Sequence, residues 1–214
     1  MSVLKTVAKE VIPYKDSYNM TVAYKITNAL DQETCNIIAG YYRQIYTNMD
    51  YEQSGNPPDN ITGGLTKGIH CRYDYLGVSL LNYFTYFIAP IVNRKILPSY
   101  SFARAYYNNA HLIPHRDRDA CEFSASLNLG NTNGTQALPF YIAKTGDNYI
   151  PSDNDEKQVI NSNVGDLIIF YGSRSADGWT HWRPPFKGDE MYNIFLHYVD
   201  QDGPYKSNAY EWLQ

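Results

Sequence analysis

The sequence has few of the residues that mark disulfide-rich or nucleic-acid-binding proteins. It contains three cysteines, which are scattered along the chain at Cys35, Cys71 and Cys121 and form no Cys-X-X-Cys pair. Their odd number and wide spacing argue against a disulfide framework and favour reduced thiols in a cytoplasmic protein. Lysine and arginine form no basic run, and the formal net charge is −4. We therefore expect no nucleic-acid partner, because phosphate binding depends on clustered positive charge.

Long hydrophobic runs are also missing. The first residues, MSVLKTVAKEVIPYKDSY, lack the apolar core of a signal peptide. No stretch approaches the ~18 consecutive apolar residues of a membrane span, so we expect no membrane partner. What the chain does have is material for a core, because 43% of its 214 residues are hydrophobic and 15% are aromatic, with 21 tyrosines. This length and composition predict one domain, and tyrosine suits both strands and pocket walls.

The first half of the chain mixes helical and strand patterns. Residues 20–26 predict a strand, and residues 29–50 predict a helix because apolar residues recur at three- and four-residue steps. The segment 51–68 is rich in glycine, proline and asparagine, and a loop of this length favours a lid over a site. Residues 78–97 predict a second, largely buried helix, which Pro90 would bend or end.

The second half of the chain is a succession of short β-type runs. They occupy residues 100–108, 122–130, 137–144, 157–162, 165–172 and 191–199. Turns rich in glycine, asparagine and aspartate separate them, which is typical of an antiparallel sandwich or barrel. Because the helices all precede the strands, the sequence predicts an α+β fold with the helices packed on one face.

The segment LIPHRDRDACEFSASLNLG, residues 112–130, carries the most informative cluster of polar residues. In an extended chain alternate side chains share a face, so His115 and Asp117 would lie together while Arg116 points away toward solvent. An imidazole and a carboxylate side by side are two metal ligands, and a facial metal site needs a third. The remaining histidines are the candidates: His70, His111, His181 and His197.

His181 is the best of these four. His197 lies in the apolar run IFLHYV, which favours a core histidine, and His70 has no ligand-type neighbour in the sequence. His111 is too near the His-X-Asp motif to supply a distant ligand. His181 follows the strand GDLIIF and a polar turn, at the rim where barrel sites form. Two histidines and one carboxylate with open positions are the facial triad of non-haem Fe(II) oxygenases.

These motifs resemble the Fe(II)/2-oxoglutarate-dependent dioxygenase superfamily, of the prolyl-4-hydroxylase-like type. The resemblance covers residues 100–205 and rests on ARAYYNNAHLIPHRD, on FSASLNLG directly after it, and on GDLIIFYG before the distal histidine. It also rests on HWRPPFKG and NIFLHYVDQDGPY, which resemble small bacterial and phage-type members with an HxD…HWR pattern.

The resemblance implies a double-stranded β-helix, or jelly roll, with the N-terminal helices packed on one sheet. One oxygenase domain would span residues 1–214, with 1–98 as helical and strand support, 99–205 as the jelly-roll core and 206–214 as a tail. His115, Asp117 and His181 would bind Fe(II), which 2-oxoglutarate chelates and at which O2 reacts. The implied reaction hydroxylates an unactivated C–H bond and releases succinate and CO2. Its substrate would be a small molecule or peptide, most simply a peptidyl or free proline-like amino acid.

The sequence departs from the superfamily where the far carboxylate of 2-oxoglutarate is usually held. The last predicted strand reads DEMYN at its start and offers no cation there. The basic residues that could replace it are Arg183, Arg118, Arg104 and Lys144. Arg183 is favoured because it belongs to the HWR pattern, and arginine pairs with carboxylates through two parallel hydrogen bonds.

Each of these residues also has a plainer interpretation. Arg118 could pair with Glu122 or Asp119 at the surface, and Arg183 could stack on Trp182 or Trp179. Tyr106 could donate its hydroxyl to the co-substrate or only pack. Asn128 should face the barrel interior, where it could bond the co-substrate or only nearby backbone.

Other functions fit the same scaffold. A non-catalytic metal-binding jelly roll would explain the missing cation, and a cupin-like enzyme would use a metal without 2-oxoglutarate. Nucleobase demethylation is disfavoured by the acidic charge. The segments 51–68 and 145–156 would shape the substrate pocket.

Overall fold

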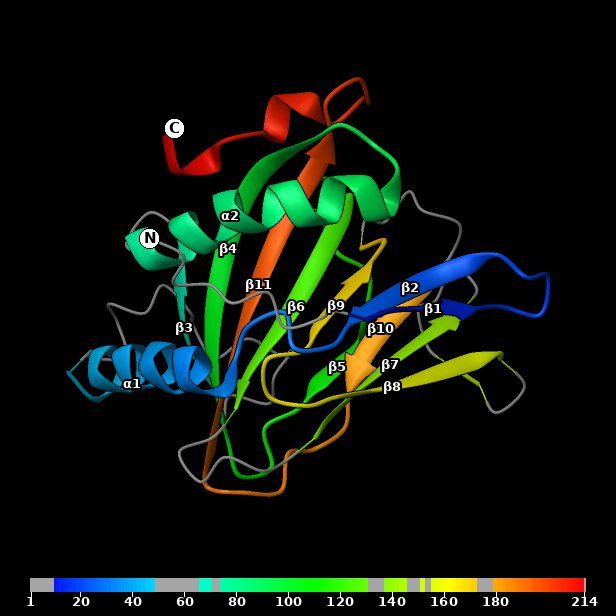
Figure 1. The fold of residues 1–214 in the computed structure, drawn as a ribbon. Helices are drawn as coiled ribbons and strands as arrows, with labels where there is room; N and C mark the ends of the chain where they lie inside the picture. The colour runs from blue at the N-terminus through cyan, green and yellow to red at the C-terminus, as the bar shows by residue number, and fades with distance from the viewer. Residues whose placement is uncertain are drawn as a thin grey trace.

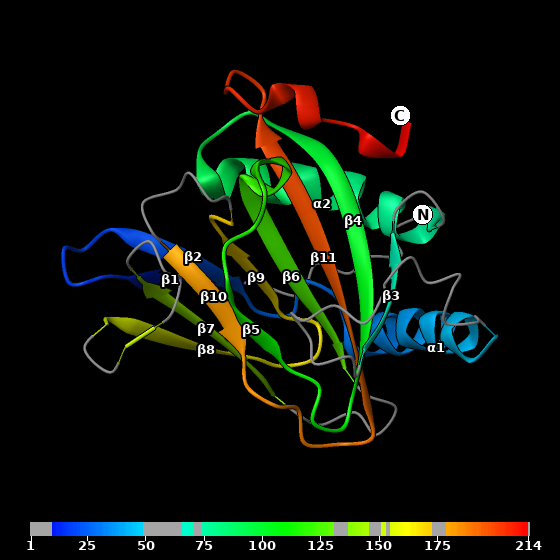
Figure 2. The same cartoon turned by 180° about the vertical axis from the view of Figure 1, so that it is seen from behind.

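The protein is an α+β fold of two antiparallel sheets, with two helices on the outer face of the larger sheet (Figures 1 and 2). The computed structural model describes residues 10–48, 66–70, 74–130, 137–145, 151–152, 155–172 and 179–213. The larger sheet has the strand order β1-β2-β9-β6-β11-β4-β3, and the smaller has the order β5-β10-β7-β8. This arrangement confirms the predicted α+β double-stranded β-helix with helices on one sheet.

The strands of the larger sheet come from both halves of the sequence. They are β1 (Val11–Lys15), β2 (Thr21–Ile26), β3 (Thr66–His70), β4 (Ile96–Tyr107), β6 (Phe123–Gly130), β9 (Leu167–Phe170) and β11 (Glu190–Asp200). The strands of the smaller sheet are β5 (Leu112–His115), β7 (Leu138–Lys144), β8 (Lys157–Ser162) and β10 (Trp179–Arg183). Residues 62 to 104 positions apart in the sequence thus lie side by side, since β11 pairs with both β4 and β6.

Alternation along the strands divides each sheet into an inner and an outer face. On β6, Leu127 and Leu129 face outward and pack into the main hydrophobic core beneath the helices. Ser124, Ser126 and Asn128 lie between them in sequence, are fully buried, and face the interior between the two sheets. An apolar outer face therefore holds the helices, while the inner face is free to carry polar side chains.

Helix α1 (Gln32–Asn48) begins at the expected cap, because Asp31 Oδ1 accepts a hydrogen bond of 2.8 Å from the Thr34 amide. Helix α2 (Tyr75–Val92) begins earlier and ends earlier than the sequence predicts. Asp74 caps its start, Pro90 lies inside it, and Asn93 ends it in the left-handed conformation at φ 51°. Residues 96 and 97, predicted as helix, start β4 instead.

The two helices depart from the sequence predictions in how much they are covered. Tyr75 and Tyr86 on α2 are 84% and 83% exposed, so this helix is less buried than predicted. Contrary to the expectation of no candidate span, α2 is long and apolar enough by length and composition to cross a membrane, with a mean hydropathy of 1.4. Its buried face packs against β4 and β11, as the core helix of a folded domain does.

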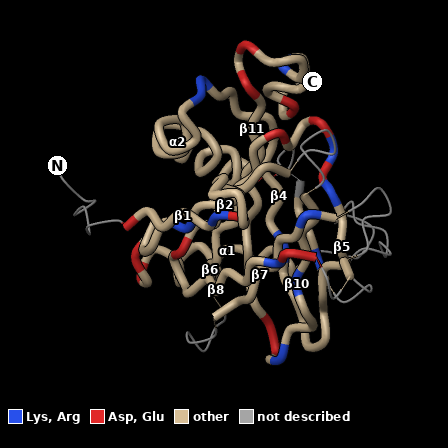
Figure 3. Tube along the Cα trace, turned by 90° about the vertical axis from the view of Figure 1, so that its right-hand side faces the viewer, with Lys and Arg blue, Asp and Glu red and all other residues tan. Residues whose placement is uncertain are grey.

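The connecting segments hold further differences. Residues 66–68, predicted as the end of a loop, form the start of β3 and pair with β4. The predicted lid at residues 51–65 and most of the turn at 145–156 lie outside the described residues. Charged residues of both signs are interspersed over the described trace (Figure 3).

Candidate metal centre

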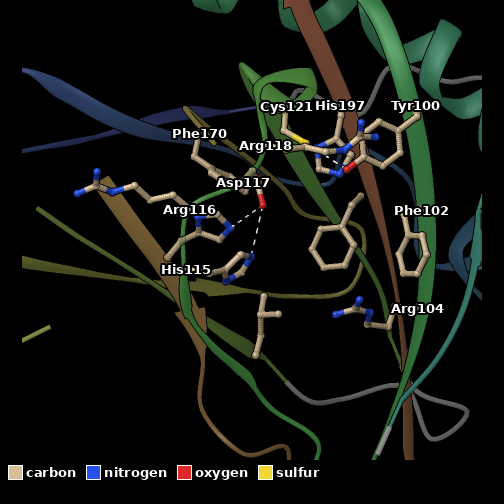
Figure 4. A pocket seen from close by; sticks show the side chains of 13 residues that line it. Tyr100, Phe102, Arg104, His115, Arg116, Asp117, Arg118, Cys121, Phe170 and His197 are labelled. Atoms are coloured by element: carbon tan, nitrogen blue, oxygen red, sulfur yellow. Dashed lines mark hydrogen bonds and ion pairs between the residues drawn. The ribbon is translucent and has the colours of Figure 1, made fainter. Parts of the chain in front are cut away.

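Three potential metal ligands meet at the open end of the two sheets. His115 is the last residue of β5, and it lies directly opposite His181 of β10 in the antiparallel register. Asp117 follows β5, and its Oδ1 is 3.3 Å from His115 Nε2 and 3.5 Å from His181 Nε2 (Figure 4). The three ligand atoms all lie within 4.8 Å of one another. The structure thus brings together the three residues that the sequence singled out.

Hydrogen bonding fixes how the ligands are presented. His115 Nδ1 is 2.8 Å from the Ile113 carbonyl oxygen, so Nδ1 carries the proton and Nε2 presents its lone pair to Asp117 and His181. The Asp117 amide donates to the Gly172 carbonyl at 2.7 Å, which ties the segment after β5 to the end of β9. Both contacts hold the motif in place through backbone carbonyl groups, which no side-chain substitution removes.

The electrostatics of the cluster favour the deprotonated forms that a metal requires. Burial alone would raise the pKa of the Asp117 carboxyl, but its polar contacts with His181 and His115 hold that pKa well below its usual range. Burial lowers the pKa of His181, so its ring is neutral at pH 7. Two neutral imidazoles and one carboxylate are the donor set of a non-haem Fe(II) site, and the residues therefore fit that metal.

The other histidines do not complete this set. His111 is half-buried and bonds the Asn109 carbonyl at 3.4 Å, and only the backbone of His70 is described. His197 is 5% exposed and stacks on Tyr100 at 4.4 Å between ring centroids, and burial lowers its pKa to about 4. The prediction that it sits in the core is met, although it also lines the pocket.

A second group of possible ligands shares the aspartate of the triad. Asp117, Cys121 and His197 also lie within 4.8 Å of one another. Burial holds the pKa of the Cys121 thiol well above its usual range, so the group offers a thiol and not the thiolate that binds metals.

A cavity of about 390 Å³ opens beside the triad, between the two sheets (Figure 4). Its lining comprises Tyr100, Phe102, Arg104, Leu112, His115, Arg116, Asp117, Arg118, Cys121, Phe170, His181, Phe195 and His197. Arg104 reaches from β4 into this cavity, with its guanidinium carbon 5.0 Å from the Phe102 ring centre. The wall facing the metal ligands is therefore aromatic with a guanidinium at its lower end.

Arg183 lies deeper between the sheets than the cavity. It is two residues beyond His181 on the same face of β10, only 2% exposed, and donates to Ser126 Oγ at 2.7 Å and to the Pro139 carbonyl at 3.2 Å. Its guanidinium lies 5.3 Å from the Phe140 ring centre, and not on Trp182 or Trp179 as the sequence allowed. Burial lowers its pKa to about 10.

Two buried polar atoms near Arg183 have unmet hydrogen-bonding capacity. Within the described part of the chain, Arg183 Nε and the Tyr106 hydroxyl have no hydrogen-bond partner. Tyr106 is 1% exposed and is close enough to Arg183 to affect the pKa of its guanidinium. Buried donors without partners are costly, so this pair marks a place for a missing acceptor.

The other candidate anchors are engaged elsewhere. Arg118 forms two hydrogen bonds with Glu211, of 2.6 and 2.7 Å, where the sequence suggested Glu122 or Asp119. Its guanidinium also lies 4.3 Å from the Tyr100 ring centre. Among the described residues Asn128 bonds only backbone, donating to the Ser162 carbonyl at 2.7 Å and accepting from the Gly130 amide at 2.9 Å. Its side chain is therefore not available to the co-substrate.

Arg116 and Lys144 also lie where they would not bind the co-substrate. Arg116 points away from the ligands, as predicted, yet it is half-buried and donates to the Thr145 carbonyl at 3.0 Å instead of facing solvent. Lys144 is exposed at the end of β7. Of the basic residues proposed from the sequence, Arg183 is buried between the sheets and Arg104 and Arg118 line the cavity, where Arg118 is already paired with Glu211.

Sequence reasoning missed the residues that support Asp117 from behind. Ser124 Oγ donates to Asp117 Oδ2 at 3.0 Å, and Gly172 lies against the same carboxylate. The sequence does contain a signal for Ser124, because the alternation of FSASLNLG predicts a polar inner face. It contains no signal for Gly172, since the contact of Gly172 with Asp117 depends on how β9 ends.

Comparison with known proteins supports the architecture. No protein-family model and no curated protein matches the sequence. Among solved structures, a viral collagen prolyl hydroxylase from Paramecium Bursaria Chlorella virus-1 in complex with 2-oxoglutarate is 12% identical, with a TM-score of 0.54 over 86% of this chain and 98% of the other. A prolyl hydroxylase from Trichoplax adhaerens, bound to a hypoxia inducible factor peptide, is 17% identical, with a TM-score of 0.54 over 84% of each chain.

A third similar structure comes from antibiotic biosynthesis. The epimerase SnoN, in complex with Fe3+, alpha ketoglutarate and nogalamycin RO, is 10% identical, with a TM-score of 0.59 over 83% of this chain and 78% of the other. At these identities the likeness is one of fold. The chain shares the double-stranded β-helix fold of these structures, and it brings His115, Asp117 and His181 together as a group that could hold a metal ion.

Proposed function

We propose that the protein is an Fe(II)- and 2-oxoglutarate-dependent oxygenase that hydroxylates an unactivated C–H bond. The observation that carries this proposal is the convergence of His115 Nε2, His181 Nε2 and Asp117 Oδ1 beside an open cavity. When bound, Fe(II) and 2-oxoglutarate would activate O2 and so supply the oxidising chemistry, with release of succinate and CO2. The protein's part is to hold three ligands on one side of the metal and to leave the other side accessible.

Arg183 and Tyr106 would hold the far carboxylate of 2-oxoglutarate. Both are buried between the sheets, and Arg183 Nε and the Tyr106 hydroxyl are donors without partners among the described residues. A carboxylate there would accept from both groups and would give the buried guanidinium a counter-ion. It would also place the keto-acid end of the molecule toward His181, two residues before Arg183 on β10.

The substrate that fits the cavity best is a peptidyl or free amino acid, of which a proline-like residue is the simplest. Tyr100, Phe102 and Phe195 offer an apolar wall for a ring, and Arg104 lies beside them to bind a carboxylate. Similar structures bind a peptide in one case and the small molecule nogalamycin RO in another. The fold is therefore compatible with either kind of substrate.

The first test is spectroscopic. Anaerobic addition of Fe(II) and 2-oxoglutarate to the protein should give the weak visible metal-to-ligand charge-transfer band of a chelated keto acid, and aerobic incubation should form succinate. His115→Ala and Asp117→Ala should abolish both. If either variant keeps the band and succinate formation, the assignment of the metal centre is wrong.

Two further measurements separate this function from its competitors. The alternative of a metal-binding module without activity is motivated by the start of β11, which carries Met191 and not a cation. Titration calorimetry showing metal binding without 2-oxoglutarate binding would establish that alternative. Oxygen uptake that is the same with and without 2-oxoglutarate would instead identify a cupin-like enzyme.

A further inference from the structure

A chain of hydrogen bonds runs behind the carboxylate of the triad. Asp117 Oδ2, the oxygen that faces away from the two histidines, is 3.0 Å from Ser124 Oγ. Ser124 Oγ is in turn 2.9 Å from His197 Nδ1. Ser124 and His197 are 0% and 5% exposed and lie on the neighbouring strands β6 and β11, where they are paired in register.

The chemistry of these groups sets the direction of the chain. An ionised carboxylate can only accept hydrogen bonds, so Ser124 must give its single proton to Asp117. The contact between Ser124 and His197 is then a hydrogen bond only if His197 Nδ1 carries a proton and donates it. His197 therefore orients the serine hydroxyl, and the serine orients the carboxylate. The stacking of His197 on Tyr100, at 4.4 Å between ring centroids, holds the imidazole in that orientation.

Gly172 closes the other side of the carboxylate. A Cβ on Gly172 would clash with Asp117 Oδ2, and it would lie 2.5 Å from Ser124 Oγ and 2.8 Å from the Cys121 carbonyl oxygen. Any other residue would displace the carboxylate or the end of β9. The Asp117 carboxylate lies between the Gly172 backbone on one side and the Ser124 hydroxyl on the other, and these two groups therefore restrict it to one orientation.

We propose that Ser124, His197 and Gly172 form a cradle that holds Asp117 Oδ2 away from the metal, so that the aspartate binds through Oδ1 alone. The three are positioning residues, because they act through Asp117 and not on the substrate. A carboxylate bound through both oxygens would take one of the coordination positions that the co-substrate or O2 needs. This inference rests on the proposed function and adds to it the device that keeps the metal accessible.

The test measures the affinity of the protein for a metal ion and does not depend on enzyme activity. Titration of the metal-free protein with Mn(II) gives the dissociation constant, and Ser124→Ala should raise it by about 10- to 100-fold, as removal of a partner behind a ligand does. His197→Leu should raise it in the same direction. His197→Asn should keep it near the wild-type value, because the asparagine amide can donate from almost the same position as Nδ1. The thermal midpoint of each metal-free variant shows whether folding is affected.

Crystal structures of the Mn(II)-loaded wild type and Ser124→Ala supply the second readout. Asp117 should bind through one oxygen in the wild type and through both in the variant. Equal Mn(II) affinity in wild type, Ser124→Ala and His197→Leu would overturn the inference, and so would two bound oxygens in the wild type. A loss in His197→Asn as large as that in His197→Leu would remove His197 from the cradle. A wild type that binds no Mn(II) would instead refute the proposed function.

Discussion

Replacing Arg183 by glutamine should selectively destroy the affinity for 2-oxoglutarate. Arg183 is 2% exposed, and among the described residues its guanidinium bonds only a hydroxyl and a carbonyl, so a bound carboxylate would be its desolvated counter-ion. Losing one partner of a buried, hydrogen-bonded charge pair costs about 2–5 kcal/mol, which is roughly a 30- to 4,000-fold rise in the dissociation constant. The fold itself should lose little, because a buried cation without a carboxylate partner contributes little to stability.

The assay is titration of the Mn(II)-loaded protein with 2-oxoglutarate, alongside thermal unfolding of the metal-free form. Arg118→Gln and Arg104→Gln are the matched controls. Arg118 is held by Glu211, and Arg104 lines the part of the cavity where we propose that the substrate binds. Both controls should keep the affinity for 2-oxoglutarate within about threefold, less than 1 kcal/mol. The reasoning fails if Arg183→Gln binds 2-oxoglutarate like the wild type, or if Arg104→Gln loses more affinity than it does.

Three further outcomes follow from the described contacts. Burial lowers the pKa of His197 to about 4, so the unfolded state binds more protons than the folded state between that pH and about 6.5. The free energy of unfolding of the metal-free protein should therefore fall by up to about 3 kcal/mol as the pH falls through this range. Urea unfolding of His197→Asn should show a weaker dependence of this free energy on pH. Gly165→Ala should lower the free energy of unfolding by about 2 kcal/mol or more. Gly165 has φ +85°, and a Cβ there would clash with the Leu30 carbonyl oxygen. An unchanged urea midpoint would contradict this prediction. Glu211→Gln should cost at most about 1 kcal/mol, because the side chain of its partner Arg118 is 48% exposed, and a larger loss in urea unfolding would mean that the pair holds the C-terminal segment in place.

The strands that could be predicted from the sequence are those with strong alternation. β6 shows why, because FSASLNLG places every second residue, Leu127 and Leu129 among them, against the helices. The intervening polar residues then had to face the interior, and Asn128 does so. The His-X-Asp motif followed from the same alternation, since an extended backbone turns His115 and Asp117 to one side.

What could not be predicted depends on contacts between distant parts of the chain. β5 and β10 are short, and their register, which puts His181 opposite His115, is set by sheet closure and not by either sequence. Arg118 pairs with Glu211, which is 93 residues away, so a local search found only Glu122 and Asp119. Local sequence identifies which side chains can bind a ligand, but tertiary pairing decides which of them are already occupied.

The proposed assignment of Arg183 moves the cation that would bind 2-oxoglutarate from the last strand, β11, to β10. Met191 faces the interior at the start of β11, pairs in register with Tyr106 of β4, and packs in the same apolar cluster. Arg183 approaches the same Tyr106 from β10, on the other sheet. Because a carboxylate bound between the sheets is within reach of side chains from both, the positive charge need not come from the last strand. On the proposed assignment, Met191 occupies the place of a long basic side chain, and Arg183, two residues past His181, would supply the charge.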